Sequence, residues 1–273
     1  MNTNSKTDTK KIRVSDSHIN LFDKLLSDKI PHESDFYFFQ NFKDVPALFI
    51  DVGANIANSV LSVHFICPQW RIVSFEPNLS LEYFLQRAKS ILDAQGQEYS
   101  YFMCGLSNTQ GKIDFFIPKI DDWFVIGEAS CIKEHFTDGV VSARLSSYSA
   151  HGGWELVESE VEIIIFDDFV KNNDIFKDET LIIVKIDVEG YEAQVLDGMK
   201  NFIQSKQPIF MIENDYSVTP NIVEEYLTLF QYQRYQYLNQ TNQLKLQNEH
   251  SLNSFYIPKT LLPSFTLKNL IIE

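Results

Sequence analysis

With 273 residues, 44% of them hydrophobic, the chain is long enough for one large α/β domain and an insertion. It has 37 acidic and 23 basic residues, and the resulting net charge of −14 at pH 7 opposes binding to phosphate backbones or anionic membrane surfaces. We therefore expect no nucleic-acid partner.

The cysteines and the lengths of the apolar runs indicate the cellular compartment of the protein. Cys67, Cys104 and Cys131 are odd in number and widely spaced, which is typical of reduced thiols in a cytosolic protein. The first eleven residues are polar and carry no apolar signal region. No stretch approaches the roughly 20 apolar residues of a membrane span. We expect a cytoplasmic protein without a membrane span, and the sequence leaves its oligomeric state open.

Residues 1–44 are expected to form an N-terminal extension that contains one helix. Apolar residues at helical spacing follow Ser15 and Asp16, either of which can cap the helix. This apolar stripe consists of Ile19, Leu21, Phe22, Leu25 and Leu26. The polar residues 1–11 are predicted to be disordered. The aromatic run 36–42 is expected to pack beside the core, and the alternative is that it lies over the ligand cleft.

The main domain, predicted for residues 45–260, begins with a buried strand, a tight turn and a helix. The residues from Leu48 to Ile50 are continuously apolar, as in a parallel strand that is covered on both faces. Gly53 allows a sharp turn, and the helix that follows aims its unpaired backbone N–H groups at whatever lies above the strand. The expected elements are a strand at 47–52, a helix at 57–66 and a second strand at 71–76.

Two acids at the ends of these strands indicate a nucleoside ligand. Glu76 follows Asp51 by 25 positions, and an acid there can accept hydrogen bonds from the two ribose hydroxyls. The turn does not spell G-x-G-x-x-G, because Asn55 and Ala57 stand where that pattern needs its later small residues. Asp51 followed by Gly53 instead suits a ligand with an ammonium group, so we favour S-adenosylmethionine over NAD. The remaining alternative is an ordinary βαβ turn that binds no ligand.

The alternation of strand and helix breaks after the third predicted strand. Gly105 and Leu106 leave the carboxyl end of that strand, where ligands bind in open α/β sheets. Residues 108–166 are predicted to be a β-rich insertion, with an irregular central stretch (118–154) that contains His135. A segment of this length is usually a lid or an acceptor-binding element, and the alternative is a hairpin packed on the sheet edge.

Outside the insertion, regular alternation continues to the end of the domain. The further strands expected are at 99–104, 181–188 and 208–213, followed by a final hairpin of strands at 235–239 and 254–257. The further helices expected are at 81–91, 192–202 and 221–230, and a short helix is expected to start at Asp167 or Asp168. Together they predict an α/β, Rossmann-like fold whose mostly parallel seven-stranded sheet has helices on both faces. Residues 261–273 remain as a C-terminal tail.

A second polar cluster ends the fourth predicted strand. Lys185, Asp187 and Glu189 share one face if the strand stays extended, and lysine is rare in a buried strand. Such charges beside a cofactor site are candidates for catalysis or ligand positioning, and the alternative is a mutually satisfied ion-pair cluster. Glu213 and Asn214 end the adjacent strand. With Asp187 they can bind a divalent ion that orients a hydroxyl acceptor, or hydrogen-bond the acceptor directly.

Four blocks of this sequence resemble the FkbM-type family of class I S-adenosylmethionine-dependent methyltransferases. They are IDVGANIANSVL (50–61), FEPN (75–78), KIDVEGYEAQVLDGM (185–199) and PIFMIEND (208–215). The resemblance spans roughly residues 45–260 and implies the class I methyltransferase fold. It also implies an O-methyltransferase of sugars or natural products, although some members are similar to enzymes that N-methylate asparagine side chains in peptides.

The resemblance implies roles for individual residues. Asp51, Gly53 and Asn55 would hold the methionine end of the cofactor, Glu76 the ribose, and Asp187 would sit beside the transferable methyl group. Gly105 and Leu106 would border the adenine. The full set expected to bind the cofactor is Asp51, Gly53, Ala54, Asn55, Ser59, Glu76, Pro77, Asn78, Gly105, Leu106 and Asp187. One departure is Ala57, where the family usually has glycine.

The predicted function is methyl transfer from S-adenosylmethionine to a sugar, glycan or natural-product hydroxyl. Asp187, or His135 from the insertion, is expected to assist removal of the hydroxyl proton, and Lys185 and Glu213 complete the catalytic candidates. The alternatives are N-methylation of asparagine in a peptide or protein and a non-catalytic cofactor-binding module; the intact Asp51, Glu76 and Asp187 argue against the latter. The requirement for a divalent metal is left open.

Overall fold

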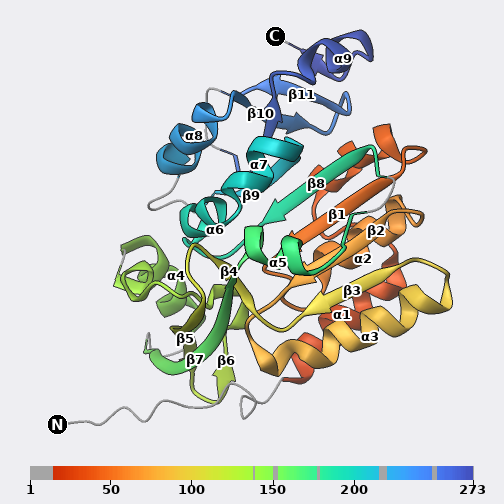
Figure 1. Ribbon diagram of the computed structural model, residues 1–273. Coiled ribbons are helices and arrows are strands. Elements are labelled where there is room, and N and C mark those ends of the chain that lie inside the picture. The colour runs from red at the N-terminus through yellow and green to blue at the C-terminus, as the bar shows by residue number, and fades with distance from the viewer. Residues whose placement is uncertain are drawn as a thin grey trace.

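The computed structural model describes residues 15–137, 139–149, 153–176, 179–214, 220–247 and 251–272 (Figure 1). The polar segment 1–11, Asp215 and part of the predicted connection 240–253 lie outside these residues. Within the described chain, no helix has both the length and the apolar character that crossing a bilayer requires.

A nine-stranded mixed sheet forms the centre of the molecule, with strand order β13-β11-β10-β12-β9-β8-β1-β2-β3. Its strands are β1 (Ala47–Val52), β2 (Arg71–Phe75), β3 (Tyr99–Phe102), β8 (Leu181–Ile186), β9 (Ile209–Glu213), β10 (Tyr232–Leu238), β11 (Gln243–Leu246), β12 (Asn253–Pro258) and β13 (Ile271–Ile272). The strands from β9 to β3 run parallel, whereas β12 is antiparallel to β9, and β10 is antiparallel to both β11 and β12.

The predicted count of seven strands is wrong, because β11 and β13 extend the sheet at one edge. β11 lies in the segment expected to connect the last two strands, and β13 lies in the segment expected to be a tail. Strands of four and two residues are too short to show a reliable alternation of apolar and polar residues. Their pairing depends on the edge that the rest of the sheet leaves available, which is a tertiary property.

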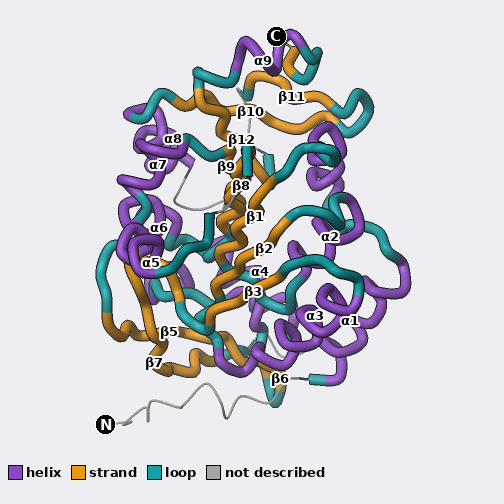
Figure 2. Tube along the Cα trace, turned by 45° about the vertical axis from the view of Figure 1, so that its right-hand side comes forward, coloured by secondary structure: helices purple, strands orange, loops and turns teal. Residues whose placement is uncertain are grey.

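Helices cover both faces of this sheet, as Figure 2 shows. One face carries α1 (Asp16–Asp28), the 3₁₀ helix η2 (Ser34–Phe42), α2 (Asn58–Ile66) and α3 (Glu82–Ala94), which follows the short η3 (Leu79–Leu81). The other carries α5 (Phe166–Asn172), α6 (Glu192–Gly198), α7 (Lys200–Lys206) and α8 (Pro220–Leu229). Successive side chains of β1 point to opposite faces of the sheet. Phe49 packs in the core under the first group of helices, and Leu48 and Ile50 pack in the core under the second group.

The N-terminal extension is part of the first core. The aromatic run 36–42 forms η2 and buries Phe36, Phe38, Phe39 and Phe42, which confirms that it packs beside the sheet. The ring of Phe38 lies 5.2 Å from that of Phe255 on β12. The link between α1 and η2 is therefore anchored at both ends. At the other end of the chain, the helix α9 (Leu262–Leu267) packs Phe265 into the same core.

The insertion forms a second, four-stranded sheet of order β4-β7-β5-β6 (Figure 1). Its strands are β4 (Gly105–Ser107), β5 (Gly111–Ile120), β6 (Trp123–Phe124) and β7 (Glu155–Ile165). The stretch predicted to be irregular instead contains α4 (Gly139–Tyr148) and the 3₁₀ helices η4 (Ile126–Glu128) and η5 (Lys133–Thr137). Of these helices, η4 brings the insertion to the carboxyl ends of β1 and β8, where Ile126 and Gly127 line a cavity.

Candidate functional site

Two adjoining cavities lie at the strand ends, and the larger of these two, about 240 Å³ and called the larger cavity here, opens at the carboxyl ends of β1, β2 and β8. Residues from β1, from the loop after β2 and from the loop after β8 line it, together with η4 of the insertion. Part of its wall is apolar and consists of Phe75, Leu106, Phe115, Ile126 and Ile163. This position is the usual ligand site of an open α/β sheet.

Gly53 shapes the floor of the larger cavity. Its φ of +89° lies in the left-handed region, and a Cβ atom built on it would stand 1.8 Å from the carbonyl oxygen of Asp187. Only glycine fits both conditions. The turn after β1 therefore lies directly against the end of β8, and the backbone N–H of Asp187 donates to the carbonyl of Val52 over 3.0 Å.

Glu76 is held rigidly at the ribose end expected for the cofactor. Its two carboxylate oxygens accept the backbone N–H groups of Asn55 and Asn78, each over 2.8 Å. Burial raises the pKa of Glu76 to about 7, although these two hydrogen bonds act in the opposite direction. Each oxygen keeps a second acceptor direction, so the carboxylate can still receive ligand hydroxyls.

Asp51 does not line the larger cavity, although the next two residues, Val52 and Gly53, do. It is fully buried, and neither carboxylate oxygen has a hydrogen-bond partner within the described part of the chain. Burial raises its pKa to about 7 even though Lys185, its neighbour across the β1–β8 pairing, lowers it. A carboxyl group placed in this way can receive a donor that arrives from the ligand side.

Lys185, Asp187 and Glu213 form one connected polar group on the strand ends. The Lys185 ammonium is 1% exposed and donates to Asp187 Oδ2 over 2.7 Å. Burial lowers the pKa of Lys185, but the charge of Asp187 and of the surrounding acids outweighs burial and raises it above the ordinary value. The cluster predicted from the sequence therefore includes Lys185 and Asp187 as an ion pair.

Glu213 and Asp187 are joined by a side-chain hydrogen bond, and each changes the pKa of the other. The charge of Asp187 and then burial raise the pKa of Glu213 to about 9. Burial acts to raise the pKa of Asp187, but the ion pair with Lys185 and the hydrogen bond from Glu213 outweigh it and lower this pKa. At neutral pH Asp187 is thus ionised and Glu213 holds the proton.

A second cavity of about 110 Å³, the smaller cavity, adjoins the first. Both cavities are lined by Asp187, Glu189 and Glu213, so they meet at the ion-paired carboxylate. The smaller cavity is also lined by Glu128, Arg144, Glu192, Asn214 and Leu252. Arg144, from α4, pairs with Glu128 over 2.5 Å. The arrangement places a polar chamber next to the larger cavity.

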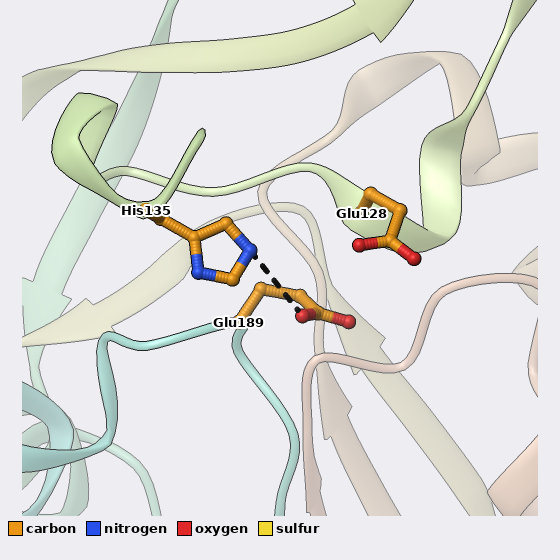
Figure 3. A group of neighbouring side chains, drawn as sticks. All are labelled: Glu128, His135 and Glu189. Atoms are coloured by element: carbon orange, nitrogen blue, oxygen red, sulfur yellow. Dashed lines mark ion pairs between the residues drawn. The ribbon is translucent and has the colours of Figure 1, made fainter. Parts of the chain in front are cut away.

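Three residues beside the smaller cavity have the composition of a metal site (Figure 3). Glu128, His135 and Glu189 each offer one ligand atom, and these atoms lie within 4.8 Å of one another. His135 Nε2 lies 3.7 Å from Glu189 Oε2. A histidine with two carboxylates can hold a divalent ion. The set weighed from the sequence is different and consists of Asp187, Glu213 and Asn214. In that set Asn214 Nδ2 donates to Ser251 O and Ser254 Oγ.

The structure gathers most of the residues expected from the sequence around the larger cavity. Those that line it are Gly53, Asn55, Glu76, Pro77, Asn78, Gly105, Leu106, Asp187 and Glu213, and those that do not are Asp51, Ala54, Ser59, Lys185 and His135. Ala54 and Ser59 are buried in the protein, and Asn58 lines the cavity in place of Ser59. Sequence reasoning missed His32 and Glu33, which belong to no pattern and reach the cavity from the N-terminal extension.

Ala57, the departure from the family pattern, does not line the larger cavity. It is the N-cap residue of α2, with φ +64° and no exposed surface. A side chain in the left-handed region costs about 1 to 2 kcal/mol. The methyl group packs in the protein core, so we expect its effect to be on folding and not on ligand contact.

Comparison with known proteins supports the assignment to a family. The model of the Methyltransferase FkbM domain matches residues 51–238, well over half of the chain. Among solved structures, the methyltransferase FkbM of Methylobacillus flagellatus KT is 14% identical, with a TM-score of 0.46, and the alignment covers 91% of this chain and 56% of that one. The chain thus spans about half the length of that protein.

A second solved structure is the precorrin-6y C5,15-methyltransferase of Geobacter metallireducens GS-15. It is 10% identical, with a TM-score of 0.36, and the alignment covers 94% of each chain. No curated protein matches the sequence significantly. The match of the family model over residues 51–238 is therefore decisive, and the chain belongs to the FkbM methyltransferase domain family.

Proposed function

We propose that this protein transfers a methyl group from S-adenosylmethionine to a hydroxyl of a sugar, glycan or natural product. The observation that carries the proposal is the charge of the larger cavity. Its described lining includes the carboxyl groups of Glu33, Glu76, Asp187, Glu189 and Glu213, and no lysine or arginine. S-adenosylmethionine offers a sulfonium, an ammonium and a ribose diol without phosphate, whereas NAD would bring two phosphates against these acids.

The individual positions fit that cofactor. Glu76 is rigid, buried and able to accept from the ribose diol. The apolar wall that includes Leu106 and Phe115 suits the adenine ring. Asp51 precedes the turn by two residues, and neither of its carboxylate oxygens has a partner in the described chain, so a buried water can link them to a donor of the ligand.

The cofactor supplies a methyl group bonded to a positively charged sulfur, a good leaving group, so the protein mainly positions the acceptor. Asp187 lies at the junction of the two cavities and is ionised, so it can take the proton of an acceptor hydroxyl as the new carbon–oxygen bond forms. Lys185 fixes its carboxylate through one oxygen. Glu213 keeps its proton and hydrogen-bonds to Asp187.

The smaller cavity supports a compact hydroxyl acceptor. Its described lining is almost entirely polar and its volume is about 110 Å³. N-methylation of an asparagine side chain in a peptide would be favoured by an open groove lined with aromatic residues of the insertion. Trp123 and Trp154 instead pack against a small core within the insertion. A small polyol or sugar, held by carboxylates through its hydroxyls, fits this chamber better.

Calorimetric titration of the purified protein tests the cofactor first. We expect S-adenosylmethionine and S-adenosylhomocysteine to bind and NAD not to bind; binding of NAD alone would refute the proposal. The same titrations with Mn²⁺ or with a chelator test whether Glu128, His135 and Glu189 hold an ion that takes part. Incubation with panels of sugars and asparagine peptides, read by mass spectrometry, then separates O-methylation from N-methylation.

A further inference from the structure

His32 lies in the wall of the larger cavity, although it precedes the region that the family model matches. It sits in the link between α1 and η2, and its side chain is 20% exposed. Its ring packs against Phe36 of η2, with ring centres 4.9 Å apart. Its Nδ1 atom lies 2.7 Å from Ser62 Oγ on α2. Two separate contacts therefore fix the ring orientation.

The hydrogen bonds of Ser62 identify the tautomer of His32. Ser62 Oγ lies 2.8 Å from the carbonyl of Asn58, and it also accepts the backbone N–H of His32 over 3.0 Å. A hydroxyl has one hydrogen. If that hydrogen goes to Asn58 O, then Nδ1–H of His32 must be the donor to Ser62, and all three contacts are satisfied. The other tautomer leaves two oxygen atoms 2.8 Å apart with no hydrogen between them.

His32 therefore keeps an acceptor lone pair on Nε2. Burial, and then the charge of Lys185, lowers the pKa of His32 to about 3, so this nitrogen carries no proton at neutral pH. Nε2 lies 3.7 Å from Glu33 Oε1. The other oxygen of Glu33 accepts from Asn253 Nδ2 over 2.8 Å. Two acceptor atoms thus stand side by side at the cavity wall, an arrangement that an N–H donor between them would satisfy.

We infer that His32 Nε2 and the Glu33 carboxylate bind the ammonium group of the cofactor's methionine moiety. This inference rests on the proposed function, and it adds a contact that lies outside the family-matched region. An ammonium has three N–H donors and a positive charge, so it can donate to both acceptors and compensate the negative charge of Glu33. A neutral hydroxyl has one donor and satisfies only one of them.

The position of His32 matches the methionine end and not the ribose end. It lies close enough to Lys185 and Asp187 for their charges to act on its ring, whereas Glu76 marks the ribose end beside β2. Asp51, expected from the sequence to hold the methionine end, is fully buried and does not line the larger cavity. His32 and Glu33 do line it, so they can touch the ammonium directly.

Calorimetry of the full-length protein with two ligands tests the contact. S-adenosylhomocysteine has the ammonium, and its deaminated analogue has hydrogen in that place. In His32→Phe the ring that packs on Phe36 remains but Nε2 is lost, so we expect the dissociation constant of S-adenosylhomocysteine to rise tenfold or more. That of the deaminated analogue should stay unchanged. His32→Asn, which keeps a donor for Ser62 Oγ, should give the same selective loss if the phenylalanine variant folds poorly.

His18→Phe is the matched control. His18 lies on α1 in the same extension and also has its Nδ1 atom 2.7 Å from a serine hydroxyl, that of Ser15, but it does not line the larger cavity. Its substitution should change neither affinity. Equal weakening of both ligands by His32→Phe, or no weakening of either, would overturn the inference. Wild-type protein that binds neither ligand would instead refute the proposed function, and the inference with it.

Discussion

Replacing Glu213 by glutamine tests whether the carboxyl group of Glu213, next to Asp187, keeps a proton in the folded protein. The charge of Asp187 and then burial raise the pKa of Glu213 from 4.5 to about 9, so the folded protein keeps this carboxyl group protonated at neutral pH. Glutamine has nearly the shape of the protonated group and still offers an N–H donor to Asp187, but it has no proton to release. The substitution therefore removes one contribution to the pH dependence of folding.

The sign of that contribution follows from which state binds the proton. Between pH 4.5 and pH 9 the unfolded chain has lost the proton of Glu213 while the folded protein retains it, so the free energy of unfolding falls as the pH rises. The limit is about 1.4 kcal/mol per pH unit. The pair binds this one proton whichever carboxyl group carries it, so we expect a change of up to about 2.5 kcal/mol between pH 6 and pH 8.

Urea unfolding of the wild type and of Glu213→Gln at pH 6, 7 and 8 measures this quantity. The free energy of unfolding of the variant minus that of the wild type should increase with pH by the amount given above. Glu225→Gln changes an exposed carboxylate on α8 and serves as the control, for which the difference should stay constant. If this difference in the free energy of unfolding also stays constant with pH for Glu213→Gln, Glu213 does not keep a proton in the folded protein.

Three further substitutions separate binding, turnover and folding. Glu76→Gln should raise the dissociation constant of S-adenosylhomocysteine about 10- to 100-fold, since it removes a charged acceptor for the ribose diol; unchanged calorimetric affinity would contradict this role. Asp187→Asn should lower turnover about 100-fold or more while the variant still binds the cofactor product, and normal turnover would exclude Asp187 as the base. Ala57→Gly should leave cofactor affinity unchanged and shift the free energy of unfolding by less than about 1 kcal/mol, because relief of left-handed strain offsets the lost buried methyl group and the freer unfolded chain. A larger shift in urea unfolding would contradict this balance, and altered affinity would show that this position acts on the ligand.

Much of the fold could be predicted because its parallel strands carry strong local patterns. The first strand has the same bounds in sequence and structure, 47–52, since a continuously apolar run followed by Gly53 is unambiguous. The helix expected at 192–202 is instead two helices, α6 and α7. Gly198 ends the first, and a Cβ there would stand 2.0 Å from the carbonyl oxygen of Ser107. Glycine is thus required at position 198 by its close contact with β4, which no local pattern encodes.

By itself, the sequence determined which residues stand at the carboxyl ends of the parallel strands, because a strand, a turn and a helix are local and the ends of parallel strands meet at one edge. Gly53, Glu76, Asp187 and Glu213 line one cavity for this reason. Only the tertiary structure decided how deep each side chain lies and what completes the walls. It buried Asp51 outside the cavity lining, placed His135 behind Glu189, and brought His32 to Ser62 across 30 positions of sequence. Such contacts depend on how distant segments pack, which the periodicity of any one segment does not record.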